Sequence, residues 1–471
     1  MSVYSTTVRH DGLSLLRERG TWLLLAVLTV ASLAAVSSGQ RELSRAKAIQ
    51  DAVELQNEKA RDETAAIANH LAQTGATVPH YRDPGLAEVV GRRLIVEQAM
   101  LPPNALFALS AGQTGVRPLQ QPVSLESREV LLSEGELTPP RMLAVGAFDL
   151  DFIIVFLAPL TLIVLGYGVP AWERQQGLLA LHLLPETTLT QWIATRHGLR
   201  LLAVIGILSV IGAFAVATNG ASVADAVRFF AYLLIAVLYL AFWSVVIVAV
   251  STRTGTADKS LLILATIWLA LVMVLPSAIN AAALIRFPAP QRIDYVDAFR
   301  EATDQARARA SEILTEYLED HPEMAAGDVD PQDYSAQRYA VRRKVEEAMS
   351  GISSDFEARR EARRNSLQWL RLLSPAILAV EGLEEAAGTG DGRYAHFNRQ
   401  AGQFHEQWRR FFEPHILSKT RFAAHADIPR FVYREEALAD LAYRLAPIYL
   451  ALTLMLLGAM VFAKRGLRFL Q

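Results

Sequence analysis

Three histidines, His396, His405 and His415, are the side chains best suited to metal binding or proton transfer at neutral pH. They lie nine and ten residues apart. Metal-binding histidines on one helix are usually three or four residues apart. The spacing therefore favours surface histidines over a metal site. The chain has no cysteine, which excludes disulfides and thiolate metal sites.

Sequence signatures of catalysis are absent from the chain. It contains no Gly-x-x-x-x-Gly-Lys-Ser/Thr loop to hold phosphates, no His-Glu-x-x-His and no Gly-x-Ser-x-Gly. We therefore expect a chain that is not an enzyme and has no cofactor of its own. The net charge of -2 and its distribution do not suggest nucleic acid as a partner.

The remaining charged candidates border long apolar runs. Asp149, Asp151, Arg200, Arg228 and Arg444 all lie at the ends of such runs, and no ionisable residue lies near a centre. Buried acids or histidines mark proton and ion relays in membrane transporters. Their absence argues against transport driven by ion coupling, so any energy must come from another protein.

The apolar residues concentrate in six blocks, most of them close to the roughly 20 residues that a helix needs to cross a membrane. No clear Ala-x-Ala cleavage site follows the first block, which favours a retained span over a signal peptide. The predicted spans are residues 21–38, 150–169, 199–218, 228–250, 260–285 and 445–462. The predicted fold class is an all-α membrane protein with six transmembrane helices.

Two long polar segments, residues 39–149 and 286–444, separate the spans and are expected to form mainly helical insertions. In the first, Arg41–Gln73 predicts one long helix, and the density of proline after it predicts loops and short elements. In the second, helices are predicted at Ile293–Glu319, Tyr334–Leu373 and Tyr394–Phe412, the last ending before Pro414. A loop is expected at Pro322–Pro331 and a turn at Gly388–Gly392.

Three smaller features in these regions have structural explanations. An aromatic stripe, formed by Phe404, Trp408, Phe411 and Phe412, is expected to pack on neighbouring outer helices. The basic cluster Arg359–Arg364 is expected to be a solvated helical face. Ser277 and Asn280 could line a passage, but a kinked helix end capped by its own side chains is the expected account.

Basic residues near the spans predict the orientation of the chain. The amphipathic N-terminal segment 1–20, the loop 170–198, the turn 251–259 and the tail 463–471 all carry Lys or Arg. Six spans place all four on one side, which the positive-inside rule makes the cytoplasm. Both termini are then cytoplasmic, and the two insertions are extracytoplasmic.

The loop after the second span has the most distinctive sequence. Polar residues Glu173–Gln176 precede a leucine cluster and then Pro185. Such a segment can lie on the membrane surface and present its polar end to a partner, although a plain interfacial turn is an alternative.

This loop resembles the coupling helix of ABC-2 type transporter permeases. In that family a Glu-Arg/Lys-x-x-Gly-Thr/Leu-Leu sequence, followed by a helix and a proline, docks into a cleft of the ATPase subunit. The matching residues here, which the resemblance assigns to ATPase docking, are Glu173, Arg174, Gly177, Leu178, Leu179 and Pro185.

The second insertion resembles ABC-2 type permeases of the DUF3526 group, which carry large insertions between spans 1 and 2 and between spans 5 and 6. The residues that carry this resemblance are Leu373-Ser-Pro375 through Leu383, Ala387-Gly-Thr-Gly390, Arg393-Tyr394, Phe397, Gln403-Phe404 and Trp408.

The resemblance implies a permease subunit in the bacterial inner membrane. Its expected partners are an ABC ATPase dimer, which would bind ATP and Mg, a second identical or related permease, the lipid membrane and a periplasmic protein. The expected outcome is substrate export or motion of a periplasmic domain. The alternative is a membrane-anchored scaffold or binding protein with an outer helical domain and no energy coupling.

Overall fold

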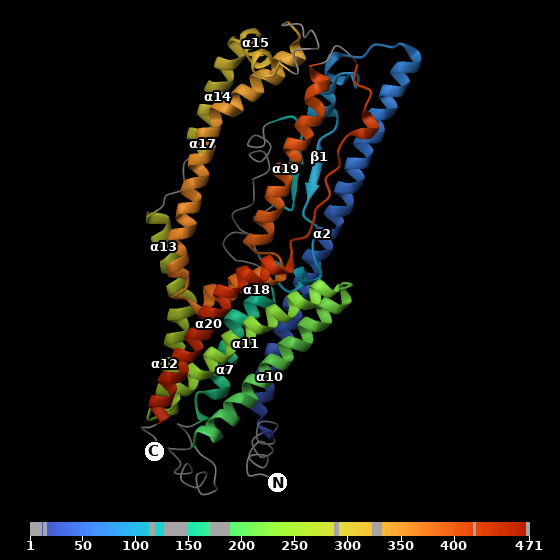
Figure 1. Cartoon of the computed structure of the whole chain (residues 1–471). Helices are drawn as coiled ribbons and strands as arrows, with labels where there is room; N and C mark the ends of the chain where they lie inside the picture. Colours follow the sequence, from blue (N-terminus) through green and yellow to red (C-terminus); the bar gives the residue numbers. More distant parts are fainter. Residues whose placement is uncertain are drawn as a thin grey trace.

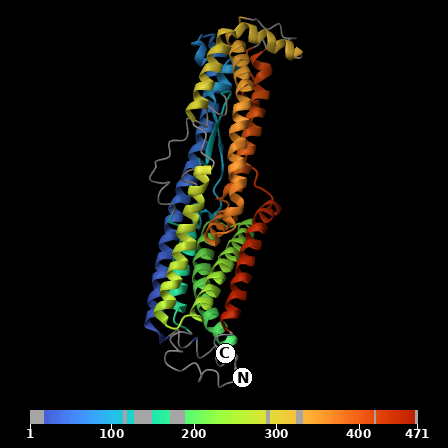
Figure 2. The same cartoon turned by 90° about the vertical axis from the view of Figure 1, so that its left-hand side faces the viewer.

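The computed structural model describes residues 12, 17–112, 118–126, 148–169, 189–286, 292–322, 332–417 and 421–467. These residues are mainly helical. They form an elongated molecule, with a bundle of apolar helices at one end and a tall outer part at the other (Figures 1 and 2). Several predictions lie outside the described residues. They concern nearly all of the N-terminal segment 1–20, the loop 170–188, residues 323–331 and the side chains of Arg359–Arg364.

Helix α2 (Arg19–Thr74) connects the bundle to the outer part without a break. Its 56 residues correspond to a length of roughly 84 Å. The helix ends at Gly75, whose positive φ of 65° allows its N–H to bond Leu71 O at 2.9 Å. The span predicted at 21–38 and the helix predicted at Arg41–Gln73 are therefore one helix.

In the part of the chain that the structure describes, five helices are long and apolar enough to cross a membrane, which fits a multi-pass membrane protein. They are Arg19–Thr74, Thr190–Thr218, Val223–Ser251, Ala257–Ala283 and Leu438–Gly466. The shorter segment Leu150–Gly166 is also apolar. The helices of the bundle after α2 are α6 (Leu150–Phe152), η4 (Ile153–Leu157), α7 (Ala158–Gly166), α10 (Leu189–Thr218), α11 (Val223–Ser251), α12 (Ala257–Leu269), η5 (Ala270–Val274), α13 (Leu275–Arg286) and α20 (Leu438–Leu467).

Two prolines of the apolar segments, Pro159 and Pro276, each lie just after a one-turn π-helix. Pro159 follows η4 and cannot donate a hydrogen bond to the carbonyl of Val155. Tyr239 of α11 donates its hydroxyl to that oxygen at 2.9 Å, which satisfies the freed carbonyl. Ser277, which follows η5 and Pro276, donates to Met273 O at 2.7 Å. Ser277 thus bonds the backbone of its own helix, which continues through α13 to Arg286 rather than ending here.

The outer part contains α14 (Arg292–Ala308), α15 (Ala310–Asp320), α17 (Tyr334–Arg371), α18 (Pro375–Ala387) and α19 (Asp391–Ile416). Two of these helices have other bounds than the sequence predicts. The helix predicted at Ile293–Glu319 is broken at Arg309, where φ is -118° and ψ is 26°. The break lets α15 pack on α17 and bury Ile313 and Leu314. Helix α19 continues through Pro414 rather than ending before it. The proline removes a backbone hydrogen bond only in the last turn, and Ile416 beyond it is buried in the hydrophobic core of the outer part, here called the outer core.

The first insertion contains short elements, as the prolines predict. They are η1 (His80–Arg82), α3 (Ala87–Val89), η2 (Val90–Leu94), β1 (Glu97–Met100), η3 (Ala105–Ala108) and β2 (Gln120–Val123), and a further turn, η6 (His425–Asp427), precedes α20. The strands pair antiparallel, with Glu97 opposite Val123 and Met100 opposite Gln120. The sequence did not predict this sheet, because each strand has four residues and β2 contains Pro122.

The aromatic stripe of α19 fills the outer core, as predicted. Phe404, Trp408 and Phe412 are buried, and the Trp408 indole N–H donates to Gly91 O at 3.0 Å. The first insertion therefore packs directly on α19. Phe411 is partly buried on the same cluster.

Helix α18 was not predicted from the sequence, although the break at Ser374-Pro375 was. Ser374 caps the helix by accepting the Ile377 N–H at 3.3 Å, and Pro375 occupies the first turn. The helix packs across α11 and α20. The approach is close at Gly382, where a Cβ atom would lie 2.9 Å from Ile235 of α11.

We expect Gly39→Ala to destabilise the contact between α2 and η3, because the new Cβ would overlap the carbonyl oxygen of Ala108. Overpacking of this kind costs about 1–3 kcal/mol. Thermal unfolding of the purified full-length protein in detergent measures the effect. Gly20→Ala is the matched control, since it lies on the same helix with no atom within 4 Å of its new Cβ. Equal melting temperatures for the two variants would contradict the prediction.

Candidate functional site

The six residues predicted to dock an ATPase lie outside the described residues, but the two helices that flank them are described. The guanidinium of Arg200 on α10 donates to Leu165 O at 2.7 Å, near the end of α7. His197 is buried and packs against Gly166. The two helices on either side of the predicted coupling loop are therefore in direct contact near the end of α7.

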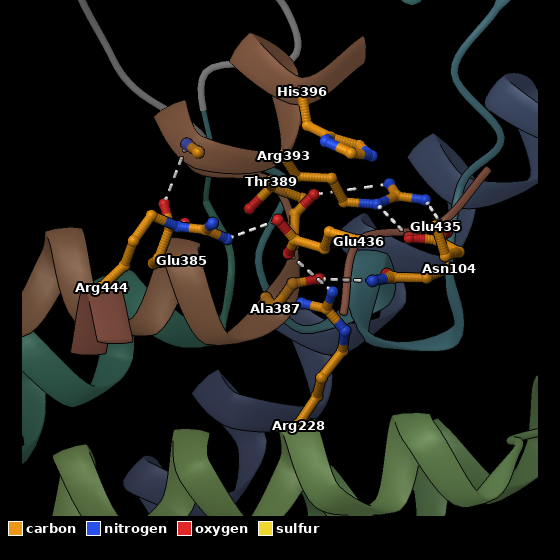
Figure 3. Close-up of polar contacts among 12 residues, drawn as sticks. Asn104, Arg228, Glu385, Ala387, Thr389, Arg393, His396, Glu435, Glu436 and Arg444 are labelled. Carbon is orange, nitrogen blue, oxygen red and sulfur yellow. Dashed lines mark hydrogen bonds and ion pairs between the residues drawn. The ribbon is translucent and has the colours of Figure 1, made fainter. Parts of the chain in front are cut away.

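A second polar cluster lies where α18, α19 and the start of α20 meet the outer end of α11 (Figure 3). We call it the junction network. It consists of Asn104, Arg228, Glu385, Arg393, Glu435, Glu436 and Arg444. Sequence reasoning placed Arg228 and Arg444 at span ends but did not identify the acidic partners.

Glu436 is the centre of the junction network. Its side chain is only 1% exposed, and its two oxygens accept from Arg228 at 2.9 Å and Arg444 at 2.6 Å. Burial alone would raise the pKa of Glu436, but the hydrogen bonds from the two guanidinium groups hold it below its usual value. Arg444 also pairs with Glu385 of α18. Glu436 thus joins α11 to α20, and a second carboxylate, Glu385, joins α20 to α18.

The turn between α18 and α19 requires glycine because it wraps around this network. Gly388 has a positive φ of 78° and ends α18. Gly392 donates its N–H to Glu385 at 3.1 Å, and a Cβ atom there would overlap both Glu385 and Arg444. The side chains of Glu385 and Arg444, a partly buried ion pair, therefore limit which residues fit in the glycine-rich turn predicted from the sequence.

Arg393 connects the network to the first insertion. This buried side chain pairs with Glu435 and donates to Pro102 O at 2.8 Å. The amide of Asn104 donates to Ala387 O, the last residue of α18, at 2.7 Å. Both insertions are therefore fixed to the outer end of the bundle.

A pair of buried acids lies beside this junction, at the start of α6. Asp149 accepts the N–H groups of Phe152 and Ala111, each at 3.1 Å. Asp151 accepts the hydroxyl of Tyr232 on α11 at 2.7 Å. Burial raises the pKa of Asp149 to about 6. The pair links the first insertion to the bundle and holds a carboxyl group that titrates near neutral pH.

The histidines do not form a site. His405 is 4% exposed and its ring nitrogen bonds Glu126 O at 2.9 Å, so the prediction of a surface residue is wrong there. The aromatic residues of α19 face the outer core, and His405 is buried with them. His396 is half-buried and bonds Arg434 O at 3.1 Å. Among the described residues, no group of three or more His, Cys, Asp or Glu side chains could hold a metal ion.

Residues 292–434 match a family model described as a domain of unknown function, DUF3526. The match covers α14 to α19 and includes Glu385 and Arg393 of the junction network. It confirms the DUF3526 part of the resemblance. No curated protein and no solved structure matches the chain.

We expect Glu436→Gln to destabilise the protein strongly, because it leaves Arg228 buried without its counter-charge. Breaking a buried pair in this way costs about 3–5 kcal/mol. Thermal unfolding in detergent tests this. Glu406→Gln is the control, since its pair with Arg409 is half exposed and such pairs are worth about 1 kcal/mol or less. Similar melting temperatures for both variants would show that the network is not needed for stability.

The raised pKa of Asp149 predicts a dependence of stability on pH. The folded state holds the proton more tightly than the unfolded state, so stability is greater at low pH and falls as pH rises from about 4 to about 6. The rise from 3.8 to about 6 corresponds to about 3 kcal/mol. Asp149→Asn should flatten this part of a plot of melting temperature against pH. Its single amide oxygen can still accept the N–H of Phe152, while the N–H of Ala111 loses its acceptor. An unchanged slope in the variant would assign the dependence to other groups.

Proposed function

We propose that this chain is the membrane subunit of an ATP-driven ABC-2 type complex in a bacterial inner membrane. Three observations support the proposal. The chain has several apolar helices of spanning length, its second insertion matches DUF3526, and residues 173–185 follow the coupling-helix pattern. A partner ATPase dimer would bind ATP and Mg and push on the loop between α7 and α10. A second permease, identical or related, would complete the complex.

The proposed topology has six spans, with the short segment Leu150–Gly166 as the second. Helix α2 begins and α20 ends at the same end of the bundle, as an even number of crossings requires (Figure 1). The positive-inside rule assigns this end to the cytoplasm. The insertions 39–149 and 286–444 then project together into the periplasm.

The continuity of α2 carries the proposal about mechanism. About 30 Å of its roughly 84 Å is needed to cross the hydrocarbon, so roughly 54 Å extends into the outer part. Helices α7 and α10, which flank the coupling loop, both contact α2 and α11. A tilt of these helices would therefore move the outer part as well. This favours transmission of motion to a periplasmic partner, with substrate export as the other outcome.

The proposal is tested by substitutions in the coupling loop. Glu173→Ala and Gly177→Val should reduce the amount of ATPase that co-purifies with the tagged full-length chain from native membranes. We expect the amount of co-purified ATPase to fall about tenfold or more, because the docking helix loses a charged contact in the first variant and its close approach to the ATPase in the second. The second measurement is Mg-ATP hydrolysis per mole of permease.

Glu63→Ala is the matched control, since it removes an exposed carboxylate from the outer half of α2. It should leave both measurements unchanged. If Glu173→Ala and Gly177→Val retain full ATPase association and ATP-dependent activity, the coupling proposal fails. A membrane-anchored scaffold without energy coupling would then be the better description.

A further inference from the structure

The bundle has an apolar groove on its side that is not used by the proposed coupling mechanism. It has a volume of about 420 Å³ and lies between α11, α12 with η5, and α20. Leu373 and Pro375, at the start of α18, line it as well. Every lining residue is apolar. The three helices that form its walls are all long and apolar enough to cross a membrane. A groove of this kind accepts hydrocarbon rather than a soluble ligand.

The two longest walls of the groove each continue into an arginine. On α11 the lining residues Val246, Ala249 and Val250 are followed by Arg253, which lies three residues after Val250 and just beyond the end of the helix. On α20 the lining residues Gly458 and Phe462 are followed by Arg465 at the same spacing, and that side chain is exposed.

Arg253 is held at the end of the groove by direct contacts with α20. Its guanidinium lies 3.9 Å from the centre of the Phe462 ring and donates to the Phe462 carbonyl. Exposed Lys259 and Lys464 lie on the adjoining turns. Asp258 is the sole acidic residue in residues 251–260, and residues 455–471 contain none. The groove therefore runs from a cationic rim into an apolar slot.

We propose that this groove binds an acyl chain of an anionic phospholipid, with the lipid phosphate at Arg253 and Arg465. Basic residues at the edge of grooves between membrane helices recognise anionic headgroups, and the charge here lies where a headgroup would be. The lining of α11 from Phe242 to Val250 covers about 12 Å. This is less than half of the roughly 30 Å hydrocarbon core, so the groove fits one leaflet and is too short for a spanning helix of a second copy.

The proposal requires that the chain spans a membrane but does not depend on ATPase coupling. Gly458 provides a direct test, since no atom lies within 4 Å of a Cβ built there. Gly458→Leu should fill the groove without disturbing the bundle. Gly206→Leu is the matched control, because it is also a glycine of an apolar helix with free space around its Cβ but lies outside the groove.

The experiment is native mass spectrometry of the purified full-length protein in detergent, titrated with phosphatidylglycerol or phosphatidylcholine. We expect the wild-type protein and Gly206→Leu to bind the first phosphatidylglycerol about tenfold more tightly than the first phosphatidylcholine. Gly458→Leu should weaken the first binding step for both lipids about tenfold. Arg465→Gln should weaken phosphatidylglycerol binding more than phosphatidylcholine binding, because both lipids carry a phosphate but only phosphatidylglycerol has a net negative charge.

Two results would overturn the proposal. One is first-step affinities in Gly458→Leu equal to those of the wild-type protein. The other is a change in oligomeric state in Gly458→Leu with unchanged lipid binding, which would assign the groove to contact between copies. The melting temperature of each variant, measured in the same detergent, shows that the bundle remains folded.

Discussion

The burial of the Glu436 carboxylate constrains the rest of the junction. A charge in a nearly water-free position is costly unless it is paired and hydrogen-bonded. Arg228 and Arg444 meet that requirement only if α11, α20 and the segment before α20 come together. The pairing of Arg444 with Glu385 then fixes α18 across the bundle. Position 392 requires a glycine because Glu385 and Arg444 occupy the space that a side chain there would fill.

Polar groups inside the apolar bundle are hydrogen-bonded as well. The carbonyl that Pro159 leaves free accepts the hydroxyl of Tyr239, and Asp151 accepts that of Tyr232. Both tyrosines belong to α11, which is therefore the helix on which the second apolar segment is aligned. No charged residue lies near the centre of an apolar block. The bond from Arg200 to Leu165 O connects the two helices that flank the predicted coupling loop.

The outer part is an extension of the bundle rather than a separate attachment. Helix α2 passes from one to the other without a break, and the insertions are joined to the outer end of the bundle through Arg393 and Asn104. The same DUF3526 region contributes both the aromatic core of α19 and the acidic partner on α18. The outer part is therefore connected to the bundle by a continuous helix and by hydrogen bonds from both insertions.

The sequence by itself determined the features that depend on local patterns. Apolar block length located the segments now seen as helices of spanning length, and helical spacing predicted the outer half of α2 and nearly all of α17. The coupling-loop residues rest on sequence alone, because the structure does not describe them. Only the tertiary structure decided the junction network, the packing of α18, the burial of His405 and the β1–β2 pairing. These depend on partners that are distant along the chain, such as Arg228 and Glu436, which are 208 residues apart. Local periodicity carries no information about such pairs, since their energy exists only once the chain has folded.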